Sequence, residues 1–268
     1  MSKFFTVEIS NPAFESNQLR FLTVKSNALR KRGDITLFLP HNVPLSAIKG
    51  MVILLHGVYG SHWSWALQGG VHTTAQQLID QQRMEPMLLI MPSDGLFGDG
   101  SAYLPHQSED YEKWIVEEVI AVVQEQLTDL PQNLPIFITG LSMGGYGALR
   151  LGAKYPHVFT SFSGLSSITD FPQLLQFLDE ADKISIQTHI VMPESVLEWM
   201  IANKEQLPSF RFDCGSDDLL IEFNRALHQQ LLENNITHQY HEYPGSHQWE
   251  YWQTHIAETL LFFNDFIK

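Results

Sequence analysis

The sequence predicts an α/β fold with a mostly parallel central sheet, antiparallel strands near the N-terminus and helices on both faces. Three observations predict it. The first forty residues alternate apolar and polar positions, as half-buried antiparallel strands do. Met51–Leu55 and Met87–Met91 are apolar throughout, which is typical of strands buried on both faces of a parallel sheet. Helical segments separate these runs, so we expect right-handed crossovers between parallel strands.

The antiparallel strands come first in the chain. Apolar residues recur at every second position around 5–9, 19–24 and 35–39. The basic run Arg30–Arg32 precedes Gly33-Asp34, and this pattern is typical of a solvated hairpin turn. These residues therefore predict a small antiparallel sheet that leads into the parallel one.

The parallel strands and their helices follow. Further strands are predicted at 136–138, 159–162, 210–214 and 238–243, and helices at 112–127, 143–155, 219–233 and 249–266. The clearest helix, 112–127, has one apolar stripe opposite charged residues, and Ser108 is placed to cap its start. Pro156 ends the predicted helix at 143–155.

One connection is unusually long. Residues 165–208 exceed an ordinary crossover and contain helical runs at 171–178 and 195–203. Excursions of this length tend to be lids. A three-layer α/β domain reaches 268 residues without splitting. We therefore expect one domain over residues 1–268, with 165–208 as a candidate lid or cap.

Composition limits the partners. The chain has 16 Lys and Arg against 30 Asp and Glu, a formal net charge of −14, and it lacks the basic clusters that bind nucleic acid or anionic membranes. It contains neither a membrane-spanning apolar run nor, at Met1–Glu8, a secretory signal. One cysteine, Cys214, allows no intrachain disulfide, and it is expected to pack in the core. We expect a cytoplasmic protein with no nucleic-acid or membrane partner.

A GxSxG motif carries the predicted chemistry. Gly140-Leu141-Ser142-Met143-Gly144 lies between a buried strand and a helix, in the context of a nucleophile elbow. The turn is so tight that residues two positions from its apex must be glycine. Ser142 would then lie at a helix N-terminus, whose dipole favours an oxyanion. Ser142 is the predicted nucleophile; the alternative is a glycine-rich turn with an inert serine.

A serine needs a histidine to take its proton and an acid to orient that histidine. In chains with this elbow the acid and then the histidine follow the serine, each at the carboxyl end of a strand. His238 and His241 lie within the last predicted strand, and His255 lies within the final helix. His247 follows that strand in a loop, so it is the predicted base.

The acid has two equal candidates. The strand that ends at Cys214 opens into Gly215-Ser216 and then Asp217 and Asp218. Asp213, still within the strand, is a third choice. The pattern does not separate Asp217 from Asp218, and we expect the unused one to cap the next helix.

An oxyanion hole needs two backbone donors. One is expected at Met143, the residue after the nucleophile, and the other in the loop 54–60 after the first parallel strand. His56 in that loop is expected to brace the turn through a hydrogen bond rather than to act in catalysis.

Two tryptophans are candidate substrate-binding residues. Trp63 follows the oxyanion loop and Trp249 follows the predicted base, so either is a candidate wall of an acyl or alcohol pocket, whereas Trp252 is expected to pack in the core. The loop 93–101 holds two aspartates among glycines but lacks the alternating ligands and closing glutamate of a calcium loop. No histidine pair has HExxH spacing, so we expect no metal.

At these residues the sequence resembles the esterase D family of α/β-hydrolases, which includes S-formylglutathione hydrolases, mycolyltransferases, feruloyl and acetyl-xylan esterases and small bacterial tributyrin esterases. The matching segments are 54–60 with Trp65 beyond, 140–149, 214–218 and 245–252. They occur in the family's order from about Gly50 to the end, and the match is closest to the small tributyrin, acetyl and feruloyl esterases.

The resemblance implies an α/β-hydrolase fold and assigns two roles that the pattern left open. The catalytic acid falls at the fourth position of the Gly-x-x-Asp turn, which is Asp218. The second oxyanion donor falls at the amide of Val58, next to Gly57.

The predicted function is that of a serine carboxylesterase acting on short-chain, acetyl-type or aryl esters through an acyl-enzyme. Its expected partner is a small-molecule ester, it needs no cofactor, and whether it forms a homo-oligomer stays open. Thioester hydrolysis and acyl transfer to an alcohol would use the same residues and are the alternatives within enzymes. A catalytically silent binding protein of the same fold is the alternative outside them.

Overall fold

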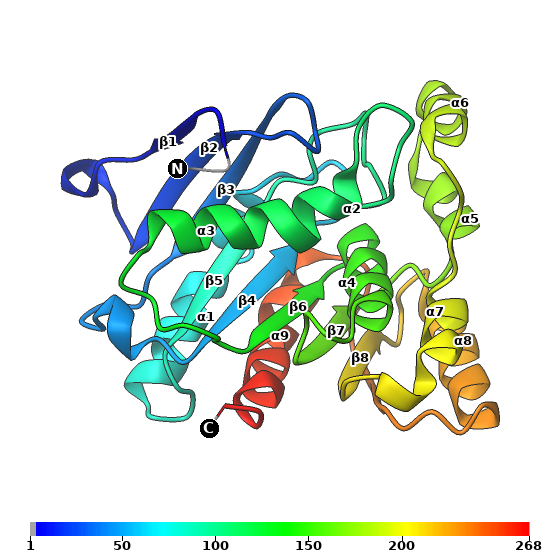
Figure 1. Ribbon diagram of the computed structural model, residues 1–268. Helices are drawn as coiled ribbons and strands as arrows, with labels where there is room; N and C mark the ends of the chain where they lie inside the picture. Colours follow the sequence, from blue (N-terminus) through cyan, green and yellow to red (C-terminus); the bar gives the residue numbers. More distant parts are fainter. Residues whose placement is uncertain (1–3, 268) are drawn as a thin grey trace.

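Nine strands form one mixed sheet in the part of the chain that the structure describes, residues 4–267 (Figure 1). The structure is a computed structural model; Met1–Lys3 and Lys268, which the expected domain includes, lie outside the described residues. The strands follow the order β1-β2-β3-β5-β4-β6-β7-β8-β9 across the sheet. Their bounds are β1 Val7–Ile9, β2 Leu19–Lys25, β3 Arg32–Phe38, β4 Gly50–Leu55, β5 Met87–Pro92, β6 Ile136–Gly140, β7 Ser161–Leu165, β8 Phe210–Gly215 and β9 Gln239–Tyr243.

The sheet changes from antiparallel to parallel along its width. β1, β2, β3 and β5 pair antiparallel with one another in that order. From β5 to β9 every neighbouring pair is parallel. This arrangement confirms the predicted fold class, including the antiparallel strands that begin it.

The central strands are apolar throughout because they face two cores. On β4, Met51, Ile53 and Leu55 pack into one core, whereas the alternating Val52 and Leu54 pack into the other. Successive side chains of a strand point to opposite faces. Both faces of β4 are therefore covered, as the unbroken apolar run predicts.

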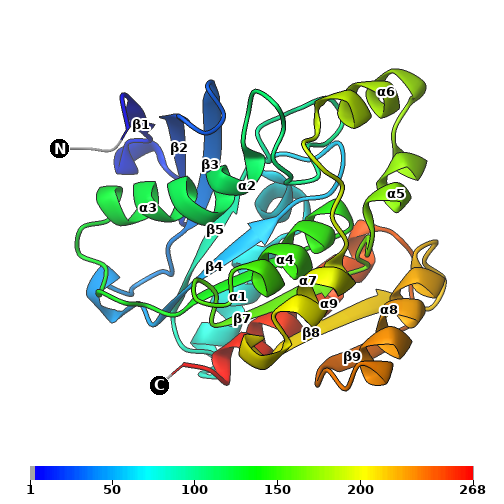
Figure 2. The same ribbon diagram turned by 45° about the vertical axis from the view of Figure 1, so that its right-hand side comes forward.

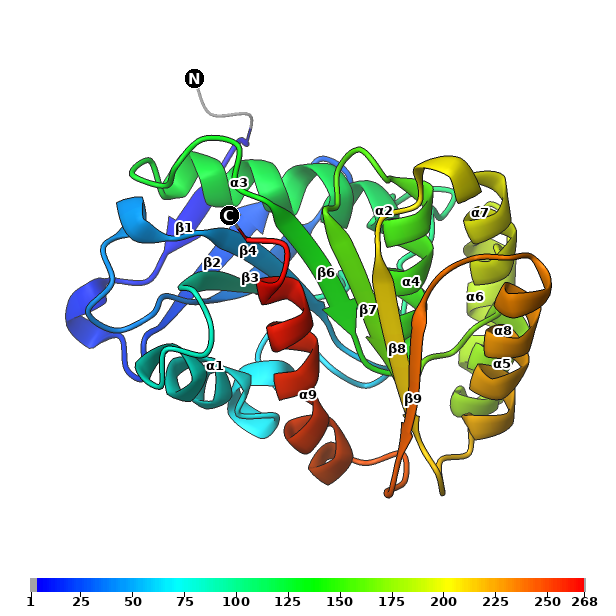
Figure 3. The ribbon, with the colours of Figure 1, turned by 90° about the horizontal axis from the view of Figure 1, so that it is seen from below.

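Helices supply the two covering layers. Their bounds are α1 Val71–Asp80, α2 Tyr111–Lys113, α3 Ile120–Gln126, α4 Met143–Lys154, α5 Phe171–Leu174, α6 Glu180–His189, α7 Val196–Ala202, α8 Ile221–Glu233 and α9 Trp249–Asn264. Figure 3 shows α1 and α9 on one face of the sheet, with α3, α4 and α8 on the other. Within the described residues, no helix combines the length and the apolar character needed to cross a membrane.

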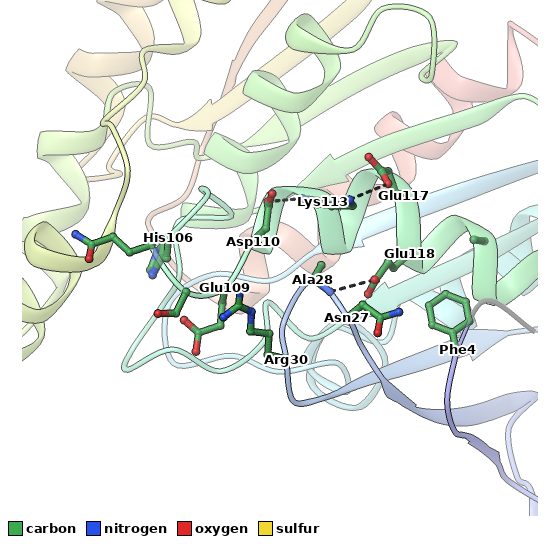
Figure 4. A pocket seen from close by; sticks show the side chains of 13 residues that line it. Phe4, Asn27, Ala28, Arg30, His106, Glu109, Asp110, Lys113, Glu117 and Glu118 are labelled. Atoms are coloured by element: carbon green, nitrogen blue, oxygen red, sulfur yellow. Dashed lines mark hydrogen bonds and ion pairs between the residues drawn. The ribbon is translucent and has the colours of Figure 1, made fainter.

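The helix that contains α2 and α3 departs from the prediction at its start and its centre. Asp110 caps it, because its carboxylate accepts the N–H of Lys113 at 2.8 Å (Figure 4). The prediction of Ser108 as the cap was wrong: Asp110 stays extended, paired with Pro105, until just before the first turn. Between α2 and α3 the segment Trp114–Val119 winds as a π-helix, which a 3.6-residue pattern does not reveal.

The long connection between β7 and β8 contains three α-helices and two short 3-10 helices. Two of the α-helices, α5 and α7, fall where helical runs were predicted. The third, α6, was not predicted, and Ile186 is its one buried residue. Figures 1 and 2 both show α5 and α6 beyond the carboxyl ends of the parallel strands. This excursion, residues 165–208, therefore reaches the end of the sheet at which α/β proteins place their sites.

Candidate active site

Ser142 lies at the apex of the turn between β6 and α4. Its backbone angles, φ 55° and ψ −117°, are sparsely populated by non-glycine residues. Its N–H donates to the carbonyl of Leu165 at 3.0 Å, and its own carbonyl accepts from Ile168 at 3.2 Å. Bonds to β7 and to the residues after it hold the strained residue in place.

The two glycines of the motif are required by close backbone contacts. A Cβ on Gly140 would lie 2.3 Å from the carbonyl oxygen of Gly144. A Cβ on Gly144 would lie 2.2 Å from the carbonyl oxygen of Leu55 on β4. Because side-chain atoms do not fit at these separations, the turn between strand and helix is possible only with glycine at both positions.

The structure brings Ser142, His247 and Asp218 into one hydrogen-bonded chain. His247 Nε2 is 3.0 Å from Ser142 Oγ, and His247 Nδ1 is 2.9 and 3.0 Å from the two carboxylate oxygens of Asp218. Ser142 and Asp218 are each 2% exposed. The three residues follow β6, β9 and β8, so the carboxyl ends of these strands bring together residues that are distant in sequence.

The other two aspartates lie outside this chain. Asp217 is exposed, and α8 begins without a side-chain cap, so the prediction that the unused aspartate caps the helix was wrong. The N–H of Leu220 donates instead to Asp218 at 2.8 Å, and this bond helps to orient the carboxylate that faces His247. Asp213 is buried under α9, where Tyr251 donates to it at 2.8 Å. Burial raises the pKa of Asp213 to about 6, against the opposing charge of Arg211.

The remaining C-terminal histidines are used elsewhere. His241 lies within β9 and His255 within α9, as the sequence predicts, and the rings of both stack on Tyr243. His238 precedes β9, and its Nε2 lies 2.8 Å from Nδ1 of His228 on α8. His247 is thus the histidine of this region that reaches Ser142.

The loop after β4 approaches Ser142 closely. A Cβ on Gly57 would lie 3.3 Å from Cβ of Ser142, and Val58 lines the same cavity as the serine. Among the described residues, neither the amide of Val58 nor that of Met143 donates a backbone hydrogen bond. Gly100 packs against both, since its Cβ would lie 2.4 Å from Met143 Sδ and 3.4 Å from Val58 Cγ1. Two unpaired donors therefore flank the serine.

His56 braces this loop from behind. It is 2% exposed, its Nδ1 lies 2.7 Å from the carbonyl oxygen of Gly57, and its Nε2 accepts the N–H of Asp94 at 2.9 Å. An accepting Nε2 places the ring proton on Nδ1, so the imidazole donates to Gly57. The Asp94 carboxylate in turn accepts from Leu96 and Ser101 at 2.8 and 2.7 Å. Backbone amides of the loop 93–101 are thus organised around this carboxylate.

A cavity of about 560 Å³ opens in front of Ser142. Trp63 and Trp249, the candidate substrate-binding residues, both line it. Trp252 is buried as expected but lines the cavity too. Six further side chains line the cavity that the sequence did not indicate as candidates: Tyr59, Ser64, Gln68, Phe177, Gln248 and Glu250. Gln68 belongs to a π-helical segment, Ser64–Gln68, that no pattern indicated.

The excursion contacts the site at Phe177. The Tyr59 hydroxyl donates to the carbonyl oxygen of Phe177, which joins the excursion to the loop after β4. Tyr59 has a left-handed φ of 61°, and its N–H donates to Asp99 at 2.8 Å. Sequence patterns link none of these positions, because the contact joins two irregular segments that lie far apart in the chain.

A buried ion network ties the excursion to α4. Arg150 on α4 is fully buried and pairs with Glu112 of α2 and, at 2.6 Å, with Glu194 of the excursion. Lys154 lies 2.9 Å from both carboxylates. Burial alone would raise the pKa of Glu112, but the charge of Arg150 and a hydrogen bond from Tyr155 outweigh it and lower this pKa. Glu112 therefore stays ionised beside Arg150, and the ion pairs of the network join the excursion to the nucleophile's helix.

Comparisons with known proteins agree with this site. A family model described as putative esterase matches residues 26–263. An acetyl esterase from Caldicellulosiruptor saccharolyticus is 28% identical over 263 residues, which cover 88% of this chain and 94% of that protein. A bifunctional endo-1,4-beta-xylanase/feruloyl esterase from Xylanibacter ruminicola is 24% identical over 162 residues, covering 57% of this chain and 22% of that protein.

Solved structures share the fold. A ferulic acid esterase has a TM-score of 0.79 at 22% identity, covering 98% of this chain and 100% of that one. An S-formylglutathione hydrolase from Staphylococcus aureus has a TM-score of 0.72 at 20% identity, covering 96% and 98%. These likenesses confirm the α/β-hydrolase fold.

The family model covers most of the chain, and the matched residues include the whole Ser142–His247–Asp218 arrangement. The resemblance found in the motifs is thereby confirmed. The chain belongs to the putative esterase family and is a carboxylic ester hydrolase.

Proposed function

We propose that the chain is a serine carboxylesterase that hydrolyses short-chain acyl or aryl esters through an acyl-enzyme. The observation that carries this proposal is the unbroken hydrogen-bonded chain from Ser142 Oγ through His247 to the Asp218 carboxylate. Such a chain activates a hydroxyl that is otherwise a poor nucleophile at neutral pH.

In the proposed first step, Ser142 Oγ attacks the ester carbonyl carbon while His247 Nε2 takes the hydroxyl proton. Asp218 holds the imidazole with its protonated Nδ1 toward the carboxylate and stabilises the imidazolium that forms. The C–O bond to the alcohol then breaks, and His247 gives its proton to the departing oxygen. The products are an acyl-serine and the free alcohol.

In the proposed second step, water attacks the acyl-serine. His247 takes a proton from this water and returns a proton to Ser142 as the carboxylic acid leaves. In both steps the carbonyl oxygen becomes an oxyanion, for which the unpaired amides of Val58 and Met143, beside Gly57, are the proposed donors. Preorganised donors of this kind usually supply the largest single contribution to catalysis of acyl transfer.

The proposed substrate size follows from the cavity. Trp63 and Trp249 are its proposed substrate-binding walls, and its volume of about 560 Å³ holds a small ester. We also propose that the described residues belong to a single domain in which 165–208 acts as a lid. Phe177 at the cavity and Glu194 in the buried network support this role.

The test combines labelling with turnover. A fluorophosphonate probe is expected to add once to the wild-type protein and not to Ser142→Ala, as read by intact mass. Hydrolysis of p-nitrophenyl acetate, butyrate and octanoate is expected to fall with chain length and to vanish in the same variant. A folded wild-type protein that takes no label and turns over no ester would contradict the proposal.

A further inference from the structure

Aromatic side chains form much of the wall of the catalytic cavity. Tyr59, Trp63, Phe177, Trp249 and Trp252 all line it. They come from three separate parts of the fold: the loop after β4, the excursion and the start of α9. Ring faces carry negative electrostatic potential and attract cations, and this attraction grows when the cation loses its water.

The charges around these rings have one sign. Among the cavity-lining residues in the described chain, Glu250 is a carboxylate and none is lysine or arginine. Burial raises the pKa of the Tyr59 hydroxyl, and the negative charges of Asp99, Asp179 and Asp182 raise it further. The lysine next to Asp182, Lys183, is paired with Glu180 at 2.6 Å. Glu250 is therefore the carboxylate in the cavity lining, and the three aspartates act on Tyr59 without lining the cavity.

A second cavity, by contrast, has basic side chains in its wall. It measures about 470 Å³ and lies between the β2–β3 turn and the helix that starts at Tyr111 (Figure 4). Its lining mixes Arg30 and Lys113 with carboxylates, and Lys113 lies 3.7 Å from Glu117. Basic side chains therefore line the second cavity, whereas among the described residues none lines the cavity in front of Ser142.

We propose that the catalytic cavity selects esters whose alcohol carries an alkylated ammonium group. The inference rests on the proposed esterase function and names its substrate class. A short acyl group fills only a small part of a cavity of about 560 Å³, so most of the room is left for the alcohol. Alkylated ammonium groups suit aromatic walls, since a primary ammonium would need three acceptors that rings do not offer.

Glu250 and the three aspartates act differently from the rings. The carboxylates attract the cation at long range, and added salt weakens this attraction because exposed charges are screened beyond about 10 Å at 0.1 M ionic strength. The rings act at contact and depend little on salt. Preference for a cationic ester should therefore have one part that salt removes and one part that persists.

The first test compares two esters of the same shape. Acetylcholine and 3,3-dimethylbutyl acetate differ in one atom, a charged nitrogen in place of carbon. We expect kcat/KM for acetylcholine to be about tenfold higher or more at low ionic strength, the gain typical of one desolvated cation–π contact. Glu250→Gln should lower this ratio severalfold. The matched control Glu8→Gln, which removes an exposed carboxylate from β1, should leave it unchanged. A ratio of one or below in the wild-type protein overturns the inference.

The second test reads the cavity without turnover. Binding of choline and of its neutral isostere 3,3-dimethylbutan-1-ol to Ser142→Ala is followed by tryptophan fluorescence, to which Trp63, Trp249 and Trp252 contribute. Tighter binding of choline is expected, and it supports the inference even if the wild-type protein hydrolyses no ester. Absence of hydrolysis would contradict the esterase proposal alone. Equal or weaker binding of choline overturns the inference while leaving hydrolysis of neutral esters intact.

Discussion

The ring of Phe177 lies beside the imidazole of His247, with ring centroids 5.4 Å apart and an angle of 32° between the planes. Trp252 meets the same imidazole edge to face at 5.0 Å. The two aromatic rings come from residues that are 75 positions apart in the chain. His247 is therefore partly enclosed by apolar groups, one of which belongs to the excursion between β7 and β8 and the other to α9.

Phe177→Ala tests whether the excursion takes part in substrate binding. Loss of the ring opens the cavity and removes an apolar contact, so we expect kcat/KM for aryl acetates to fall about tenfold. Most of the loss should appear in KM, because His247 keeps its bonds to Ser142 and Asp218. Phe14→Ala, at an exposed phenylalanine next to β1, is the control. Unchanged kinetics in Phe177→Ala would show that the excursion plays no part in binding.

A pair of isosteric variants tests the acid. In Asp218→Asn the amide can no longer hold the required tautomer of His247, so kcat should fall by about 10⁴-fold. Asp217→Asn, one residue away and exposed, should retain nearly full activity. Steady-state hydrolysis of p-nitrophenyl acetate measures both, and circular dichroism checks that each variant folds. A larger loss in Asp217→Asn would reverse the assignment.

His56→Ala tests a positioning residue behind the oxyanion loop. The change removes the bonds to Gly57 and Asp94 and frees the amide of Val58 to move. We expect kcat to fall by about 10²-fold, as when one oxyanion donor is lost, with KM nearly constant. His157→Ala, at an exposed histidine after α4, controls for loss of an imidazole. A higher KM with unchanged kcat in His56→Ala would contradict a role of His56 in stabilising the transition state.

His106 predicts an acid-sensitive stability. Burial, opposed by a hydrogen bond to Ser101, lowers the pKa of His106 to about 4; His189 and Lys31 lower it further, and Asp94 raises it. The unfolded chain, with a histidine pKa of about 6.5, therefore takes up the proton first. The contribution of neutral His106 to the free energy of unfolding is complete above pH 6.5. It is lost as the pH falls toward 4, and the loss is about 2 kcal/mol at pH 5.

The measurement for His106 is urea unfolding at pH 7 and at pH 5. His106→Gln keeps a donor for Ser101 but does not titrate, so its free energy of unfolding should change less between the two pH values than that of the wild-type protein. Equal changes in both proteins would show that this histidine does not couple folding to protons.

Arg150→Met tests the buried network. The change leaves Glu112 and Glu194 with Lys154 as their one remaining cation in that cluster. Removing one partner of a buried ion pair costs about 3–5 kcal/mol, so we expect the free energy of unfolding to fall by that amount. A triple replacement with Glu112→Gln and Glu194→Gln should recover much of it. Chemical denaturation measures each variant, and a loss below about 1 kcal/mol would contradict a structural role for the network.

The sheet and the nucleophile elbow were predictable because their causes are local. Strands such as β4 are buried on both faces, so their residues are apolar. Gly140 and Gly144 are required because a side chain at either position would collide with the backbone of the turn or of β4. The last strand and the last helix were also predicted, although the residues of β9 are polar or aromatic and none is buried. Their positions fixed the loop that contains His247.

What escaped prediction depends on contacts between distant segments. Phe177, Tyr59 and Glu250 meet at the cavity, but nothing near them in the sequence records the meeting. The predictions of the helix caps at Ser108 and before α8 were wrong for a related reason. Several polar residues near a helix start can act as its N-cap, and the path of the preceding chain decides which of them does. The choice between Asp217 and Asp218 likewise depended on the path of a loop.

The separation of the reactive residues has a consequence for how activity arises during folding. Ser142 and His247 are 105 positions apart, and the histidine follows β9, which joins the sheet at its edge. Contacts between such distant residues form late, since closing long loops is slow. A chain still being synthesised thus carries a complete elbow without its base and is inert toward esters. In refolding experiments, recovery of esterase turnover should mark the docking of β9 and α9, after the sheet signal has already returned.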